Sequence, residues 1–159
     1  MIVVADTSPL RYLILIDHVH VLPALFGEVI VPPAVLAELT NEQTPEEVRT
    51  WVANRPEWLS VRAPRESLPQ LRGRIDDGER EAIALAVEVG ADALLIDDRD
   101  GRRHAQALKC QVTGTLGVLA DAADRGLADL PTALDRLRST NFRADRRVID
   151  EILKRTRGT

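Results

Sequence analysis

Short strand-like runs alternate with helical patterns along most of the chain. Each run is too brief for a helix, and together they cover residues 2–5, 29–31, 93–96 and 111–113. Helical periodicity or a helix-start signal follows each run, at residues 9 onward, 34–39, 98–108 and 116–125. A further helix is predicted over residues 77–89 and ends at Gly90. Because such alternation is typical of βαβ units, the pattern predicts an α/β fold with a central, mainly parallel sheet.

The middle of the chain departs from this alternation. Residues 44–74 are polar and interrupted by prolines, while Val48, Trp51 and Val52 predict one amphipathic helix. Residues 58–61 are predicted to be extended, and we interpret the whole segment as a helical insertion. Helices are also predicted at residues 131–138 and 146–154, and a helical tail covers about residues 140–159.

Length and composition indicate one soluble domain. A chain of 159 residues can bury a sizeable core without disulfides or metals as staples, so residues 1–159 are expected to form a single domain. Cys110 is the single cysteine, and the N-terminus lacks the features of a secretory signal. No uncharged apolar run reaches the roughly 20 residues that a membrane-spanning helix needs. We therefore expect the protein in a reducing cytoplasm.

Carboxylates recur at one predicted edge of the sheet. They follow two strand-like runs or lie near the starts of helices, and they are Asp6, Glu38, Glu79, Glu81, Asp97 and Asp98. The carboxyl ends of parallel strands form the crevice in which α/β proteins bind ligands. Several carboxylates there would repel each other unless a hard cation such as Mg2+ or Mn2+ joined them. The implied chemistry is metal-assisted phosphodiester hydrolysis without a side-chain nucleophile.

Each acid also has a purely structural explanation. Asp6 could cap the helix that begins near Pro9, and Asp77 is the expected cap of the helix at residues 77–89. One acid of the Asp97-to-Asp100 stretch could cap the next helix, but three acids around one turn exceed what capping requires. Zinc is not expected, since the histidines lack metal-ligand spacing with one another or with a cysteine; they are His18, His20 and His104.

Five ordered motifs resemble the PIN-domain family, most closely its VapC-like branch. The motifs span residue 2 to about residue 138 and read VVADTSPL, VIVPPAVLAEL, DDGEREAIALA, LLIDDRDGRRHA and VTGTLGVL. The resemblance implies a compact three-layer α/β/α nuclease fold. It matches the family's four acids to Asp6, Glu38, Glu79 and Asp98. Neighbouring acids leave two matches open, because Glu81 is close to the third, and Asp97 and, less well, Asp100 are close to the fourth.

The resemblance also implies roles beyond these acids. Ser8 matches a small polar residue that supports the first acid. The implied activity is RNA cleavage by the toxin of a toxin–antitoxin pair, as a homodimer inhibited by a small cognate antitoxin. Positive charge for an RNA backbone could come from Arg99, Arg102, Arg103 and Lys109, or from the C-terminal residues Arg143, Arg146, Arg147, Lys154 and Arg155. The net charge of -4 argues against RNA binding by the overall field of the protein.

Two other classes of protein remain open at this stage. A phosphoaspartyl phosphatase would need a second aspartate two residues after Asp6, where Ser8 stands. A receiver domain would need paired acids after the first strand and a lysine at a later strand end, and the chain fits that pattern poorly. A catalytically silent binding or regulatory module with the same fold is the other alternative, because one displaced ligand can abolish activity.

Overall fold

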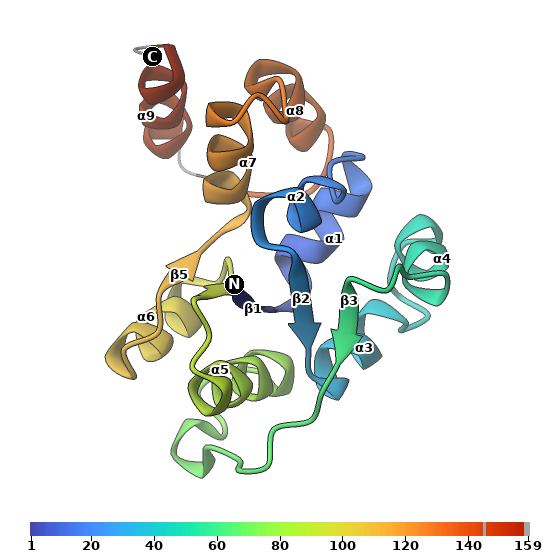
Figure 1. Ribbon diagram of the computed structural model, residues 1–159, viewed down its shortest axis with the longest axis vertical. Coiled ribbons are helices and arrows are strands. Elements are labelled where there is room, and N and C mark those ends of the chain that lie inside the picture. Colours follow the sequence, from blue (N-terminus) through green and yellow to red (C-terminus); the bar gives the residue numbers. More distant parts are fainter. Residues whose placement is uncertain (145, 158–159) are drawn as a thin grey trace.

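A parallel sheet forms the centre of the computed structural model, which describes residues 1–144 and 146–157 (Figure 1). The sheet has five strands in the order β3-β2-β1-β4-β5, and all four pairings are parallel. The strands are β1 (Ile2–Ala5), β2 (Glu28–Val31), β3 (Leu59–Val61), β4 (Ala93–Leu95) and β5 (Val112–Thr113). The predicted parallel α/β architecture is therefore confirmed, and the described chain forms three layers, α/β/α.

Helices connect the strands and cover both faces of the sheet. They are α1 (Thr7–Leu15), α2 (Val21–Phe26), α3 (Pro33–Leu39), α4 (Glu46–Ala53), α5 (Asp77–Val89), α6 (Arg99–Ala107), α7 (Thr115–Asp124), α8 (Leu130–Arg138) and α9 (Arg146–Arg157), with a short 3-10 helix at Pro69–Leu71. Helix α5 packs on β1 and β4, whereas α2 packs on β2 and, with α1, on α7. In Figure 1, α8 and α9 lie at one end of the molecule, with α5 and α6 nearer the other. None of the described helices is long and apolar enough to cross a membrane.

The strand order reverses at β1, and this reversal fixes where a ligand can bind. The chain runs from β1 outward through β2 to β3, then returns to place β4 on the other side of β1. Ala5 pairs with Leu95, and the Asp6 backbone N–H donates to the Leu95 carbonyl oxygen at 2.8 Å. The carboxyl ends of β1 and β4 therefore lie side by side at the switch point, where open α/β sheets bind their ligands.

The central strands are apolar throughout because helices cover both of their faces. Val3, Val4 and Ala5 in β1 are fully buried, as are Leu94 and Leu95 in β4. Such strands show no alternation of polar and apolar positions, so they appear in the sequence as short continuous apolar runs. The buried centre supplies a rigid base for the residues that follow β1 and β4.

The segment 44–74 differs from the expected helical insertion. It does contain the predicted helix, α4, in which Val48 and Val52 are buried. Its extended stretch, however, forms β3, which pairs with β2 through Val29 and Leu59 and completes one edge of the sheet. Only Leu59 of β3 is buried, because an edge strand contributes few side chains to the core, and the sequence signal for the strand is correspondingly weak.

The C-terminal tail contains the predicted helix as α9, which packs on α7. Residues 145, 158 and 159 of the predicted tail lie outside the described residues, as does the side chain of Arg155. The tail is thus joined to the domain through α7, on the side of the edge strand β5, which α7 also contacts.

Gly90 is expected to be needed for stability. It ends α5 in the left-handed conformation, with φ 60° and ψ 48°, as its place after the helical pattern predicted. A Cβ there would meet no atom within 4 Å, so the penalty for alanine comes from the backbone alone. We expect Gly90→Ala to lower the free energy of unfolding by about 1 kcal/mol, measured by urea denaturation. Unchanged stability would contradict this conformation.

Candidate active site

Asp6 lies at the centre of the candidate site. It follows β1 and is buried, with 5% of its surface exposed. It occupies the position before α1, but its side chain makes no capping hydrogen bond. Its Oδ1 atom is buried and has no hydrogen-bond partner in the described part of the chain. Helix capping therefore does not account for this aspartate. Its unpartnered oxygen is free to coordinate a metal ion or to accept a hydrogen bond from a ligand.

Glu38 reaches the same site from α3. Its Oε2 accepts a hydrogen bond from the Thr7 hydroxyl at 2.7 Å, and Thr7 directly follows Asp6. Gly78, in the first turn of α5, leaves space for the other carboxylate oxygen, because a Cβ on Gly78 would lie 2.3 Å from Glu38 Oε1. The contact between α3 and α5 thus holds the Glu38 carboxylate beside the end of β1.

The start of α5 contributes Asp76 and Glu79. Asp76 caps the helix by accepting from the Glu79 backbone N–H at 2.8 Å. The predicted cap, Asp77, is wrong by one residue: Asp77 lies inside the helix, where its exposed side chain pairs with Arg80 at 3.0 Å. The Glu79 side chain is buried, with 8% of its surface exposed, and so faces inward from the first turn.

Asp97 and Asp98, after β4, have different hydrogen-bond partners. Asp97 accepts from the Thr115 backbone N–H and the Thr115 hydroxyl, both at 2.7 Å, which ties it to the start of α7. Asp98 caps α6 by accepting from the Gly101 backbone N–H at 2.9 Å. One acid is therefore fixed toward α7 and the other toward α6, at the end of the same strand.

The electric field of its neighbours acts on Asp6. The pKa of Asp6 is raised to about 7, first by burial and then by the charges of Asp76, Glu38 and Asp97, against a partial offset from the Thr7 backbone N–H. Carboxylates from three other segments are therefore close enough to repel the charge on Asp6.

Glu79 and Glu38 respond to the same group of charges. Burial, then Asp76, Asp6 and Asp98, raise the pKa of Glu79 to about 8. The pKa of Glu38 is raised by burial and by Asp76, while the Thr7 hydroxyl lowers it. We call this group the acidic cluster, and its members are Asp6, Glu38, Asp76, Glu79, Asp97 and Asp98.

Asp76 is the member that the sequence did not single out as a ligand. Among the charged neighbours that raise the pKa of Asp6, Glu38 and Glu79, Asp76 has the largest effect on each of the three. The sequence does hold a signal for it, because the pair Asp76-Asp77 precedes a glycine and a glutamate at a helix start. Had the sequence prediction placed the helix cap one residue earlier, it would have identified Asp76 as the cap and as a neighbour of the other acids.

Two of the additional candidate acids lie elsewhere. Glu81 accepts a hydrogen bond from the Ala34 backbone N–H at 3.3 Å, at the start of α3. Asp100 is exposed and pairs with Arg103 at 3.1 Å. The hydroxyls that bond to the cluster are those of Thr7 and Thr115, and among the described residues Ser8 has no such bond. Thr7 is the first residue of α1 and directly follows Asp6, and Thr115 is the first residue of α7 and bonds to Asp97.

The chemistry of the cluster fits a hard divalent cation. All of its donors are carboxylate oxygens, the ligands that Mg2+ and Mn2+ prefer, and Asp6 Oδ1 is buried without a partner. Across residues 1–144 and 146–157, no group of three or more aspartate, glutamate, histidine or cysteine side chains is arranged so that it could hold a metal ion as it stands. The cluster is therefore a set of neighbouring acids, and His18, which bonds to the Ile16 carbonyl oxygen, belongs to another part of the fold.

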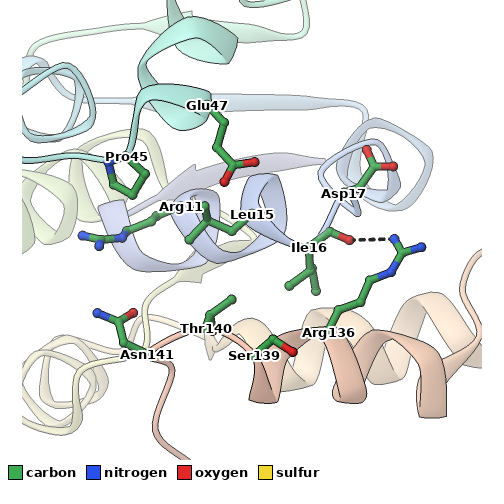
Figure 2. Close-up of a pocket in the computed structure, with 10 residues that line it drawn as sticks. All are labelled: Arg11, Leu15, Ile16, Asp17, Pro45, Glu47, Arg136, Ser139, Thr140 and Asn141. Atoms are coloured by element: carbon green, nitrogen blue, oxygen red, sulfur yellow. Dashed lines mark hydrogen bonds between the residues drawn. The ribbon is translucent and has the colours of Figure 1, made fainter.

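A separate cleft of about 640 Å3 lies between α1, the start of α4 and the end of α8 (Figure 2). It carries charges of both signs, from Arg11, Arg136, Asp17 and Glu47. Arg136 donates to the Ile16 carbonyl oxygen at 3.1 Å and so ties α8 to the end of α1. No member of the acidic cluster lines this cleft, so it is distinct from the candidate site.

Gly78→Ala is expected to disturb the cluster without unfolding the protein. The new Cβ would overlap Glu38 Oε1, the end of a flexible side chain, so the carboxylate can move aside at little cost in stability. Alanine also favours the helix. We expect an unchanged or slightly raised melting temperature and about tenfold weaker binding of Mn2+. Binding of Mn2+ at the wild-type level would show that the position of the Glu38 carboxylate is unimportant.

Comparisons with known proteins agree with this architecture. The chain is similar over 77% of its length to a PilT N-terminus domain protein of the hyperthermophilic archaeon Sulfolobus solfataricus, covering 93% of that chain with a TM-score of 0.56 and 18% identity. No curated protein matches the sequence. The family model DUF3368, described as a PIN domain, matches residues 2–157. PIN domains are generally nucleases. The chain belongs to the PIN-domain family.

Proposed function

We propose that the protein is a metal-dependent endoribonuclease that hydrolyses RNA phosphodiester bonds. The observation that carries the proposal is the buried Asp6, whose Oδ1 has no partner in the described chain and whose neighbours are carboxylates from three other segments. Such an arrangement is unfavourable for the protein alone, because burial and like charges both oppose ionisation. A bound divalent cation would compensate that cost, and membership of a family of nucleases supports the same chemistry.

The acids proposed to hold Mg2+ or Mn2+ are Asp6, Glu38, Glu79, Asp97 and Asp98. A bound ion of this kind lowers the pKa of water and neutralises charge on phosphate oxygens. The protein's own contribution is to position the acids. Thr7 holds one oxygen of Glu38, and Thr115 holds both oxygens of Asp97, so their carboxylates keep fixed orientations. Catalysis is assigned to Asp6, Glu38, Glu79 and Asp98, with Asp76 adding negative charge beside them.

The resemblance to the VapC-like branch supports a more specific role. We propose that the protein is the toxin of a toxin–antitoxin pair that acts in the cytoplasm as a homodimer and is inhibited by a small cognate antitoxin. Coexpression with the product of a small neighbouring reading frame tests this part. A complex that suppresses RNA cleavage is expected, and a partner that leaves cleavage unchanged would contradict the toxin role.

RNA cleavage by the purified protein tests the proposed activity. A pool of structured and single-stranded RNA is incubated with Mg2+, Mn2+ or EDTA, and the products are resolved on a gel. We expect cutting with either metal and none with EDTA. No cutting under any metal would contradict the proposal and favour a PIN-fold binding or regulatory module.

A further inference from the structure

A groove of about 1060 Å3 opens beside the acidic cluster. It is bounded by residues of α6, β5, α7 and α9, and Figure 1 shows α6, β5 and α9 along one side of the molecule. Asp97 of the acidic cluster lines this groove. A molecule lying in the groove would therefore reach the candidate active site at the end of β4.

The groove combines basic and apolar side chains. Helix α6 contributes Arg99, Arg102 and Arg103, and Arg143 adds a further guanidinium from the segment before α9. Apolar side chains also line it, among them Phe142 and Val148, and 43% of the surface of Val148 is exposed. Besides Asp97, one further carboxylate, Asp121, lines the groove, so positive charge prevails among its charged groups.

Arg102 is a guanidinium of the groove whose charge acts on Asp97 of the cluster. Its Nη1 donates to the Ile96 carbonyl oxygen at 3.3 Å, at the end of β4. A Cβ on Gly114 would lie 2.8 Å from Arg102 Nη1 and 2.8 Å from Asp97 Oδ1, so only glycine leaves room for both groups. The cation and the carboxylate consequently sit side by side where the groove meets the cluster.

This pattern of charge matches a single nucleic-acid strand. A strand presents phosphates along its backbone and unstacked, partly apolar base faces on the other side, whereas a duplex hides its base faces. Arginine is suited to phosphate because its planar guanidinium donates two parallel hydrogen bonds. An acidic and apolar peptide would match the walls too, but the groove ends at carboxylates assigned to phosphodiester cleavage.

We infer that the groove between α6 and α9 holds a single-stranded stretch of the RNA next to the cleaved bond, with Arg102 as the positioning residue that binds a flanking phosphate. The inference rests on the proposed function, since the strand must continue into the acidic cluster. Arg99, Arg103 and Arg143 supply a more general attraction along the groove, because Arg99 and Arg143 are exposed and Arg103 is paired with Asp100.

RNA binding without cleavage tests the assignment. Asp6→Asn serves as the background protein, in EDTA, with a short fluorescein-labelled single-stranded RNA and fluorescence anisotropy at several salt concentrations. Adding Arg102→Ala is expected to weaken binding about tenfold and to reduce the salt dependence by about one counterion. Arg102→Lys is expected to keep the salt dependence while losing part of the affinity. The control Arg138→Ala removes the same charge from α8, outside the groove, and is expected to change affinity by less than about twofold.

Two outcomes would overturn the assignment. Equal loss of affinity in the Arg102 and Arg138 variants would show that Arg102 does not contact the bound RNA. Equal binding of a duplex of the same sequence would contradict a single-stranded substrate. The failure of the proposed function is a separate result. In that case wild-type protein cleaves no RNA with any metal, whereas failure of the groove alone leaves metal-dependent cleavage intact.

Discussion

Asp6→Asn is expected to abolish metal-dependent RNA cleavage and to stabilise the metal-free protein. Asp6 is the buried acid with an unpartnered oxygen, and its loss removes a proposed metal ligand. Since changes around metal ligands already cost 10- to 100-fold, we expect cleavage to fall by more than about hundredfold. The substitution also removes a buried charge that neighbouring acids repel. The new amide would still lack hydrogen-bond partners, which offsets part of this gain. We therefore expect the free energy of unfolding to increase by about 2 kcal/mol at pH 8, or the melting temperature by about 6 °C.

The matched control for this variant is Asp100→Asn. Asp100 is also an aspartate next to the site in sequence, but it is exposed and pairs with Arg103. Its substitution is expected to leave both activity and melting temperature nearly unchanged. The account would be contradicted by an active Asp6→Asn protein. A large fall in its melting temperature would instead indicate that Asp6 has a structural role.

The stability of the metal-free protein is expected to fall as the pH rises from about 4 to about 8. The pKa of Asp6 rises from 3.8 to about 7 on folding, and that of Glu79 rises from 4.5 to about 8. Over this range the folded protein binds more protons than the unfolded chain, so the free energy of unfolding decreases with increasing pH. The loss amounts to a few kcal/mol and is measured by urea denaturation at a series of pH values.

A divalent metal is expected to reverse this loss. Mg2+ binds the ionised carboxylates and must displace their protons, so its affinity increases with pH. At a concentration 100 times its dissociation constant, a ligand stabilises the folded state by about 2.7 kcal/mol. We therefore expect Mg2+ to raise the melting temperature more at pH 8 than at pH 6, and much less in Asp6→Asn. An equal increase at both pH values in both proteins would point to binding elsewhere.

Much of the fold follows from the sequence because the central strands are short, apolar and followed by helix signals. The resemblance to PIN domains is confirmed by the family match over residues 2–157. The edge strand β3 was the exception to the predicted organisation. Val61 is 37% exposed and only Leu59 is buried, so the segment lacks the apolar character that reveals β1 and β4. Sheet membership there depends on pairing with β2, which local pattern does not encode.

The site was harder to predict in detail than the fold. Sequence pattern placed Asp6 and Asp97 at the ends of strands, where the structure has them, but it did not separate neighbours that differ by one or two positions. A shift of one residue at the start of α5 distinguishes the cap Asp76 from the exposed Asp77. Likewise Glu79 is buried, whereas Glu81, two residues later, bonds to the backbone of α3. Helix phase, set by the cap and by packing, decides these cases.

The hydroxyl partners illustrate the same limit. The resemblance assigned a supporting role to Ser8, while the hydrogen bonds to the cluster come from Thr7 and Thr115. Thr115 lies 18 residues from Asp97 in the chain, and the pairing of β4 with β5 brings the two together. Contacts of this kind depend on tertiary structure and carry no local signal.

Binding of Mn2+ to the metal-free protein tests the central claim most directly, since the loss of the electron paramagnetic resonance signal of free Mn2+ reports binding without any RNA. At pH 8 we predict saturable binding to the wild-type protein, strong loss of binding in Asp6→Asn, and binding at the wild-type level in Asp100→Asn. The claim that four segments of the chain assemble one metal site at the end of β1 would be contradicted by absent binding in the wild type, or by unchanged binding in Asp6→Asn.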